Sequence, residues 1–513
     1  MNKFFTLIIT IGLYGCKATN SNQTKIANPN DYAQTITATE LKDLLYIYAS
    51  DEFEGRDTGQ PGQKKAVNFL REKYKKMNLS GGMPDKTYFQ NVPLYNQKVS
   101  TSSLKYNGKT YENFKTQVVL EAPKSSVLKA NEFIYANYGI DDTNYSDYGT
   151  IDIKDKVVLI RTGEPKIDGN YITTGTSEDT KWTSYNKGLE NKVEVAKKKG
   201  AKAILIIAPQ LFDKFSNYYK AAYDANKSGR LSLDKNSNRI PILMLNETFG
   251  NELTNDLKDK SVSQTISKPI QISIENNSEV KSENVLAFIE GSEKPNEILV
   301  VSAHLDHIGM RNGEVFNGAD DDGSGTVSVL EIAEAFSKAV NDGFSPKRSI
   351  LFLHVTGEEK GLYGSRYYTD VDPIYPLENT IANLNIDMIG RTDPKREGER
   401  NYVYLIGSDK LSTDLHNLSE EVNTKCCNVE LDYTYNDEND PNRFYYRSDH
   451  YNFAKNNIPV IFYFNGTHDD YHQSTDTPDK IEYDLLENRA RLVFHTAWEL
   501  ANREEKILVD KGN

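Results

Sequence analysis

Residues 298–325 read ILVVSAHLDHIGMRNGEVFNGADDDGSG, and this stretch decides the fold. It opens with an apolar run of strand length, 298–303, and leads into a helical pattern over 326–340. Further apolar runs of strand length lie at 349–355, 381–386 and 459–464, and a second helical pattern covers 485–500. Strands that alternate with helices predict an α/β fold with a mixed, mostly parallel sheet and helices on both faces.

Acidic residues or histidine follow each of these four apolar runs within a few positions. The first run leads into His304-Leu305-Asp306, the second into Glu358-Glu359, the third into Asp387, and the fourth into His468-Asp469-Asp470-Tyr471-His472. Open α/β sheets place their sites just outside the carboxyl ends of their strands. The coincidence therefore predicts one catalytic or metal site at that edge of the sheet.

The spacing within these groups suggests separate roles for neighbouring residues. On an extended chain His304 and Asp306 point to one face, so the Asp306 carboxylate is expected to hold the second ring nitrogen of His304 and fix its tautomer. Glu358 and Glu359 diverge, so one can bind a metal while the other faces the substrate as general base.

Three consecutive aspartates, 320–322, stand before the first helical pattern. Their charges repel one another unless a cation compensates them, which favours a metal site, with a solvated loop or a calcium site as the alternative. Asp387 at the end of its strand is also awkward to bury unpaired. His354 lies in mid-strand among Leu and Val and is interpreted as a core residue.

Composition narrows the class of protein. At 513 residues, two domains and a leader are expected. The 61 basic and 74 acidic residues give a net charge of −13, which argues against a nucleic-acid partner and for peptides or small molecules. Besides Cys16, the cysteines are Cys426 and Cys427, and neighbouring cysteines do not easily close an unstrained disulfide. We therefore expect no disulfide framework, and any metal must be held by histidine and carboxylates.

The first residues have the pattern of an export signal, with Lys3 before the short apolar run 4–13. The sequence that follows, Leu13-Tyr14-Gly15-Cys16, resembles a bacterial lipobox, in which the cysteine becomes the lipid-bearing N-terminus. Residues 1–16 are thus predicted to be a lipoprotein signal, and 17–37 a flexible tether. The mature chain would be an exported, membrane-anchored lipoprotein facing the periplasm or the cell surface; an ordinary cleaved signal is the alternative.

The middle of the chain has a different texture. Residues 101–278 are rich in Asn, Tyr, Lys and Asp around apolar units at 156–160, 203–207 and 240–245, and carry no cluster of catalytic residue types. This segment is predicted to be a domain inserted between two parts of the catalytic domain, 38–100 and 279–508.

The ordered set of motifs, with the lead segment Ser-Asp-Glu-Phe-Glu-Gly-Arg at 50–56, resembles metallopeptidase family 28, the dinuclear zinc aminopeptidases and their carboxypeptidase relatives. The segment 101–278 resembles a protease-associated (PA) domain. The resemblance implies two Zn²⁺ ions per chain: His304 and Asp387 hold one, Glu359 and His472 the other, and Asp321 bridges them.

The resemblance also implies a catalytic set, in which Glu358 is the general base and Tyr471 helps to stabilise the oxyanion. Asp306 is expected to support catalysis by holding the ring of His304. Ser448-Asp449-His450 and Asp476 are expected behind the ligands or beside the substrate. The expected function is peptide-bond hydrolysis by an aminopeptidase with peptide substrates. The alternatives are a carboxypeptidase or dipeptidase of the same family, a single-zinc glutaminyl cyclase, and a catalytically silent receptor-like member.

Overall fold

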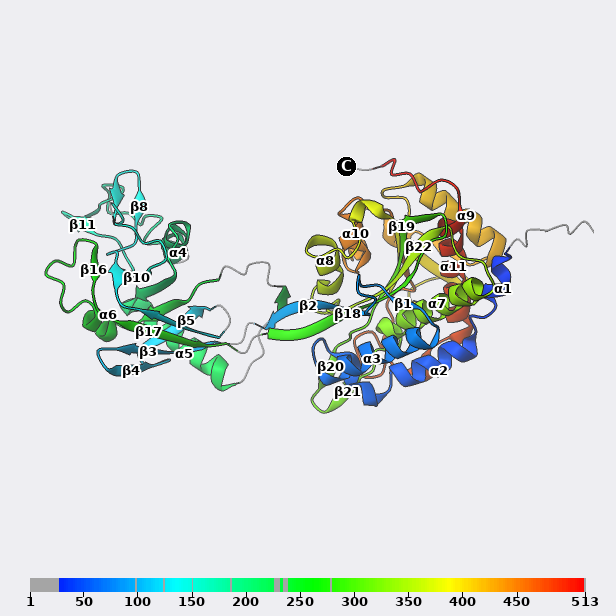
Figure 1. Cartoon of the computed structure of the whole chain (residues 1–513), viewed down its shortest axis with the longest axis horizontal. Helices are drawn as coiled ribbons and strands as arrows, with labels where there is room; N and C mark the ends of the chain where they lie inside the picture. Colours follow the sequence, from blue (N-terminus) through cyan, green and yellow to red (C-terminus); the bar gives the residue numbers. More distant parts are fainter. Residues whose placement is uncertain are drawn as a thin grey trace, which may run out of the picture.

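The computed structural model describes residues 27–511 apart from 97–98, 123–124, 150, 185–186, 226–230, 234–238 and 277–278. The predicted signal and the predicted lipidation site, Cys16, lie outside the described residues. Among those described, no helix is both long and apolar enough to cross a membrane. Figure 1 shows two bodies built of sheet and helix, joined by the long β2–β18 ribbon.

The larger sheet carries the predicted site. Its strand order is β14-β2-β18-β22-β19-β23-β26-β24-β25, with β1 beside β18. The strands are β1 (Ser80–Gly81), β2 (Phe89–Asn96), β14 (Leu231–Leu233), β18 (Glu279–Ile289), β19 (Lys294–His304), β22 (Arg348–Val355), β23 (Thr380–Ile386), β24 (Tyr402–Ile406), β25 (Glu430–Asp432) and β26 (Val460–Phe464). The central strands β22, β19, β23 and β26 run parallel, while antiparallel pairs flank them. Their carboxyl ends therefore meet at one edge.

Helices cover both faces of this sheet. They are α1 (Pro29–Ala33), α2 (Ala38–Tyr48), α3 (Pro61–Lys76), α7 (Gly325–Asn341), α8 (Tyr363–Asp370), α9 (Thr413–Cys426), α10 (His450–Ala454) and α11 (Tyr483–Asn502). Along β19, Leu299 and Val301 join the core under α2, α3, α7 and α11, whereas Ile298 and Val300 join the core under α8 and α10. This alternation is the period of a strand buried on both faces. The predicted fold class is confirmed.

The predicted tether is wrong over its last part. Residues Pro29–Ala33 form α1, which Asn28 caps through its side chain. Ile36 is fully buried in the main core, and Arg491 donates to its carbonyl at 2.8 Å. Enough apolar surface is buried here to order a segment whose polar composition suggested a flexible chain.

The inserted segment forms a sheet of order β16-β7-β10-β13-β15-β5 and an antiparallel sheet β4-β3-β17-β6. The first contains β5 (Gln117–Glu121), β7 (Phe133–Tyr135), β10 (Val157–Arg161), β13 (Ala203–Ile207), β15 (Ile242–Leu245) and β16 (Gln264–Ile266), and the second contains β3 (Thr101–Tyr106), β4 (Lys109–Glu112), β6 (Ser126–Ala130) and β17 (Ile270–Glu275). Helices α4 (Gly188–Lys198), α5 (Pro209–Asp224) and α6 (Glu247–Leu253) accompany them. The three predicted apolar units supply β10, β13 and β15.

The insertion is not wholly separate from the larger sheet. The chain leaves along β2 and returns along β18, and these strands pair antiparallel, with Tyr95 opposite Glu279. Within the insertion, β14 comes back to pair with β2, placing Leu233 opposite Leu94. The Tyr363 hydroxyl, at the start of α8, donates to the Leu231 carbonyl at 2.6 Å.

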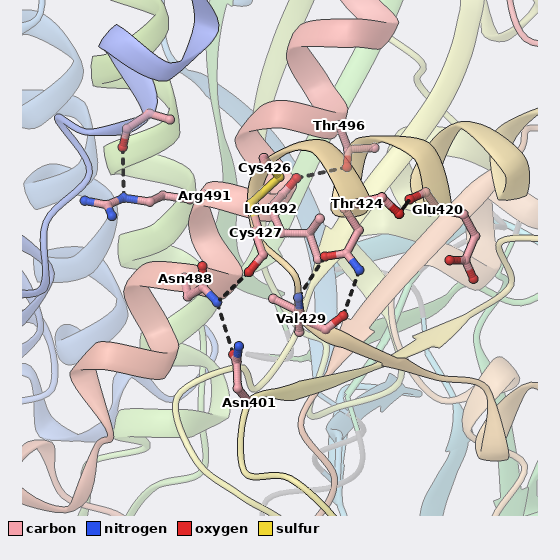
Figure 2. The surroundings of a disulfide bond; sticks show 12 residues. Asn401, Glu420, Thr424, Cys426, Cys427, Val429, Asn488, Arg491, Leu492 and Thr496 are labelled. Atoms are coloured by element: carbon pink, nitrogen blue, oxygen red, sulfur yellow. Dashed lines mark hydrogen bonds between the residues drawn. A yellow bond between two sulfur atoms is a disulfide. The ribbon is translucent and has the colours of Figure 1, made fainter.

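Cys426 and Cys427 form a disulfide with each other (Figure 2). The expectation that neighbouring cysteines do not easily close a disulfide is therefore wrong for this pair. Helix α9 ends at Cys426, and Cys427 leaves the helical conformation with φ −124° and ψ −25°. Because the backbone changes direction between them, the two side chains do not diverge as they would within a helix.

Candidate metal centre

The four parallel strands bring the predicted ligands to one edge of the sheet. His304 is the last residue of β19, Asp387 follows β23, and Glu359 follows β22. His472 lies beyond β26, and Asp321 precedes α7. Residues up to 168 positions apart in sequence meet because parallel neighbours end on the same side.

Asp321 lies between the two histidines. Its Oδ1 is 3.1 Å from His304 Nε2, and its Oδ2 is 3.1 Å from His472 Nε2. Asp387 Oδ1 lies 3.6 Å from His304 Nε2, and Glu359 Oε2 lies 3.3 Å from His472 Nε2. All five predicted ligands thus share one cluster, with Asp321 at its centre.

The donor set fits metal ions. Two groups of donor atoms each lie within 4.8 Å of one another: His304, Asp321 and Asp387 in one, and His307, Asp321 and Glu359 in the other. Within the described chain, His304 Nε2 is buried and makes no hydrogen bond, although carboxylate oxygens face it. Imidazole nitrogen and carboxylate oxygen are ligands that suit Zn²⁺. Asp321 is common to both groups, and a two-metal site needs such a shared carboxylate.

His307 is a candidate ligand that the sequence prediction missed. Its ring is fully buried, with Nδ1 2.8 Å from Glu359 Oε1 and 3.8 Å from Asp321 Oδ2. Alternation along an extended strand would turn His307 away from His304. The strand ends at His304, however, and the His307 N–H donates to the Arg56 carbonyl at 3.3 Å. The signal available in sequence was a second histidine in the same short motif.

The predicted role of the Asp306 carboxylate is wrong. His304 Nδ1 lies 3.0 Å from the main-chain carbonyl of Asp306, so the backbone fixes the tautomer. The carboxylate instead accepts a hydrogen bond from the Thr58 hydroxyl at 2.6 Å and one from the Glu358 N–H at 3.1 Å. Asp306 therefore acts on the turn that carries Glu358.

Two of the three consecutive aspartates need no cation. Asp320 accepts from the Gly390 N–H at 2.7 Å and lies 3.1 Å from His468 Nε2. Asp322 accepts from the N–H groups of His304 and Met388, both at 3.1 Å. Only Asp321 faces the donor cluster, so these hydrogen bonds correct the expectation that one cation compensates the three charges.

Asp476 lies behind the central ligand, as expected of a supporting residue. Its Oδ2 accepts from the Asp320 N–H at 3.0 Å and from the Asp321 N–H at 3.2 Å. Burial, with the charge of Asp320 next, raises the pKa of Asp476 to about 6. Its hydrogen bonds hold the backbone from which Asp321 projects.

Within the Ser448-Asp449-His450 motif, the serine contacts a predicted ligand. Its hydroxyl donates to Asp387 Oδ2 at 2.6 Å. Asp449 accepts from the Ser365 hydroxyl, and burial raises its pKa to about 7. His450 stacks on Phe462 at 4.7 Å between ring centroids, and burial lowers its pKa to about 3. His450 is therefore a neutral, packed ring.

Glu358 faces a small cavity beside the cluster. Its other lining residues are Asp321, Asp387, Met388, Phe444, Arg447, Ser448, Phe462, Phe464, Thr467 and Tyr471. The Tyr471 ring also stacks on His472, with centroids 3.9 Å apart. The cavity is thus lined by both carboxylate and aromatic side chains, as expected of a site that takes a substrate with an apolar group.

The two glutamates differ electrostatically. Burial, reinforced by Asp387 and Glu359, raises the pKa of Glu358 well above its usual range despite the opposing charge of His304. Burial also acts on Glu359, but His307 and His472 outweigh it and hold the pKa of Glu359 at about 2. The pKa values of these neighbouring carboxyls are therefore pushed apart. Such a difference suits Glu358 to proton transfer and Glu359 to the role of a permanently ionised ligand.

Comparison with known proteins agrees with the motifs. The model of Peptidase family M28 matches residues 284–497, and that of the PA domain matches residues 115–253. A leucine aminopeptidase 1 of Sclerotinia sclerotiorum is 30% identical over 228 residues, which are 42% of this chain and 56% of that protein. A probable zinc metalloprotease of Pyrenophora teres f. teres is 36% identical over 27% of this chain and 26% of that protein. The chain thus spans between about a quarter and just over half of these curated relatives.

Among solved structures, an aminopeptidase from Aneurinibacillus sp. strain AM-1 is 20% identical with a TM-score of 0.46, covering 95% of this chain and 99% of that one. The glutaminyl cyclase of Porphyromonas gingivalis is 18% identical with a TM-score of 0.33, covering 43% of this chain and 78% of that one. The family matches and the clustered ligand motifs lead to one conclusion: residues 284–497 form a region of peptidase family M28, and residues 115–253 ahead of it match a PA domain.

Proposed function

We propose that this chain is a dinuclear zinc exopeptidase that removes residues from the amino terminus of peptides, and that it is exported and anchored by a lipid on Cys16. The observation that carries the catalytic part is the position of Asp321, whose two oxygens face His304 and His472 at equal distances of 3.1 Å. His304 and Asp387 would hold one Zn²⁺, and Glu359 with His472 and His307 the other.

Two zinc ions at these positions would supply Lewis acidity for the scissile carbonyl and for a water molecule. The residues supply the proton transfer. Glu358, with its raised pKa, accepts the proton of the attacking water and returns it to the leaving amine. The Tyr471 hydroxyl, from the lining of the same cavity, donates to the oxyanion. Asp306 and Ser448 hold Glu358 and Asp387 in place.

Preference for the amino terminus is supported by the aminopeptidase names among the relatives. The test uses three forms of one peptide, with free ends, an acetylated amino terminus or an amidated carboxyl terminus, beside metal analysis of the purified protein. We expect shortening from the amino terminus, resistance of the acetylated form and about two zinc ions per chain.

Other outcomes would identify the alternatives. Resistance of the amidated form alone would indicate a carboxypeptidase. Pyroglutamate formed from amino-terminal glutamine, without peptide hydrolysis and with one zinc, would indicate a glutaminyl cyclase. Binding of peptides without turnover or metal would indicate a receptor.

A further inference from the structure

We propose that Cys426, Cys427 and His495 form a second, redox-gated metal site that takes a thiophilic cation, such as Zn²⁺ or Cu⁺, when the disulfide is reduced. The site is separate from the metal centre described above and does not rest on the proposed peptidase function. It unites the carboxyl end of α9 with the middle of α11.

The first argument is the proximity of the three donors. The two Sγ atoms and a ring nitrogen of His495 all lie within 4.8 Å of one another. Two donors on one zinc ion are at most about 4.6 Å apart, since Zn–S bonds are about 2.3 Å long. The described backbone therefore already places the ligands near the spacing that one ion requires.

The second argument is the state of His495. Its side chain is 9% exposed, and across the described ranges it makes no hydrogen bond, its ring contact being with the adjacent Phe494. Burial, with the charge of Arg491 second, lowers the pKa of His495 to about 4. The ring is thus a neutral imidazole, the form that binds a metal.

The third argument is that Cys427 is held by bonds other than the disulfide, while Cys426 is the last residue of helix α9 (Figure 2). The Cys427 N–H donates to the Asn423 carbonyl at 3.1 Å, and the Cys427 carbonyl accepts from Asn488 at 3.4 Å. The Asn423 side chain closes the following turn on Val429, donating at 2.7 Å and accepting at 2.9 Å. Reduction should therefore free the sulfur atoms without releasing the turn.

The chemistry proceeds in two steps. A dithiol reductant transfers two electrons and two protons, so that the S–S bond breaks, two thiols form and the reductant becomes a disulfide. Binding of the cation then displaces one proton from each thiol as two metal–thiolate bonds form and the imidazole supplies the third ligand. Thiolate with imidazole selects soft or borderline ions over calcium and magnesium. In an oxidising compartment the site stays closed as the disulfide.

The experiment adds Co²⁺ to the full chain in a Cys16→Ala background, where Cys426 and Cys427 are the remaining cysteines. After treatment with a dithiol and its removal under anaerobic conditions, we expect a thiolate-to-cobalt charge-transfer absorption that saturates at one ion per chain. Zn²⁺ should abolish it by competition. The His and carboxylate ligands of the main centre contain no sulfur, so they cannot produce this band.

Variants separate the proposal from a simple pair of thiols. Cys427→Ser should abolish the absorption, and His495→Ala should weaken Co²⁺ binding at least about tenfold. His416→Ala removes a histidine of α9 that is not among the proposed ligands, and it should leave binding unchanged. Absence of the band in reduced protein, its presence in oxidised protein, or equal affinity in His495→Ala would each overturn the proposal. Peptide hydrolysis, or circular dichroism if hydrolysis is absent, verifies folding of every variant.

Discussion

The carboxylate of Asp306 holds the backbone N–H of Glu358 at 3.1 Å, across 52 positions of sequence. This bond links the loop after β19 to the turn after β22 and fixes the residue proposed as general base. Since the same carboxylate also accepts from Thr58, three separate segments meet at one buried group.

Asp306→Ala should lower kcat by about tenfold to a hundredfold while both metal ions stay bound. Its side chain positions Glu358 and is not a ligand, so misplacement of the base is the expected loss. Asp306→Asn should retain more activity, because its amide oxygen can still accept from the Glu358 N–H. Steady-state kinetics beside zinc analysis checks this; loss of both ions in folded Asp306→Ala would contradict it.

Glu358→Gln should keep both metals and lose turnover, since proton transfer by a positioned group contributes roughly 10² to 10⁴ in rate. Glu359→Gln should instead weaken one site, so that excess zinc partly restores its activity. No zinc concentration should rescue Glu358→Gln. If Glu358→Gln loses zinc while Glu359→Gln keeps it, the two roles are reversed.

His307→Ala should weaken zinc binding at one site by about tenfold to a hundredfold. The reason is the 2.8 Å approach of its Nδ1 to Glu359, which either completes the ligand set or orients that carboxylate. Equilibrium dialysis with zinc measures the change. His450→Ala offers a matched control, a buried histidine stacked on Phe462 outside the ligand cluster; unchanged zinc affinity in His307→Ala would remove His307 from the site.

Glu331→Gln should stabilise the fold at alkaline pH. Glu331 is 3% exposed in α7, and burial, with Glu334 next, raises its pKa from 4.5 to about 8. A raised carboxyl pKa means that the folded state resists ionisation. The unfolding free energy therefore falls as pH rises above about 4.5, and the loss is complete above about 8. The gain in unfolding free energy should be on the order of 3–5 kcal/mol at pH 9 and small at pH 5.

Chemical denaturation at the two pH values measures that gain. Glu334→Gln, on the same helix, should give a smaller gain at pH 9, because it leaves Glu331 buried and removes only the second cause of the raised pKa of Glu331. An equal gain for Glu331→Gln at pH 5 and pH 9 would show that the effect is packing and not ionisation.

Cys16→Ala should release the protein from membranes if Cys16 carries the lipid. Fractionation of cells that express either form gives the answer, with mass spectrometry of the mature amino terminus. An unmodified terminus elsewhere in the wild-type chain would exclude the lipid anchor.

The sequence predicted the parallel centre of the sheet well, because apolar runs followed by acidic residues are patterns among neighbouring residues of the chain. The sequence did not predict the hydrogen-bond partner of each buried polar group. Asp306 and His304 are two residues apart, yet the bond forms to the carbonyl of Asp306 while its carboxylate turns to Glu358. Likewise, repulsion between Asp320 and Asp322 is relieved by backbone N–H groups that only tertiary packing delivers.

The return of β14 to the larger sheet means that the inserted segment protects the catalytic domain from self-association. Leu231–Leu233 pairs with the end of β2, covering main-chain groups that would otherwise lie at the edge of the sheet. An uncovered edge invites pairing with another chain. Excising 101–278 would spare every proposed ligand but open this edge, so the shortened protein should keep its metals and tend to self-associate.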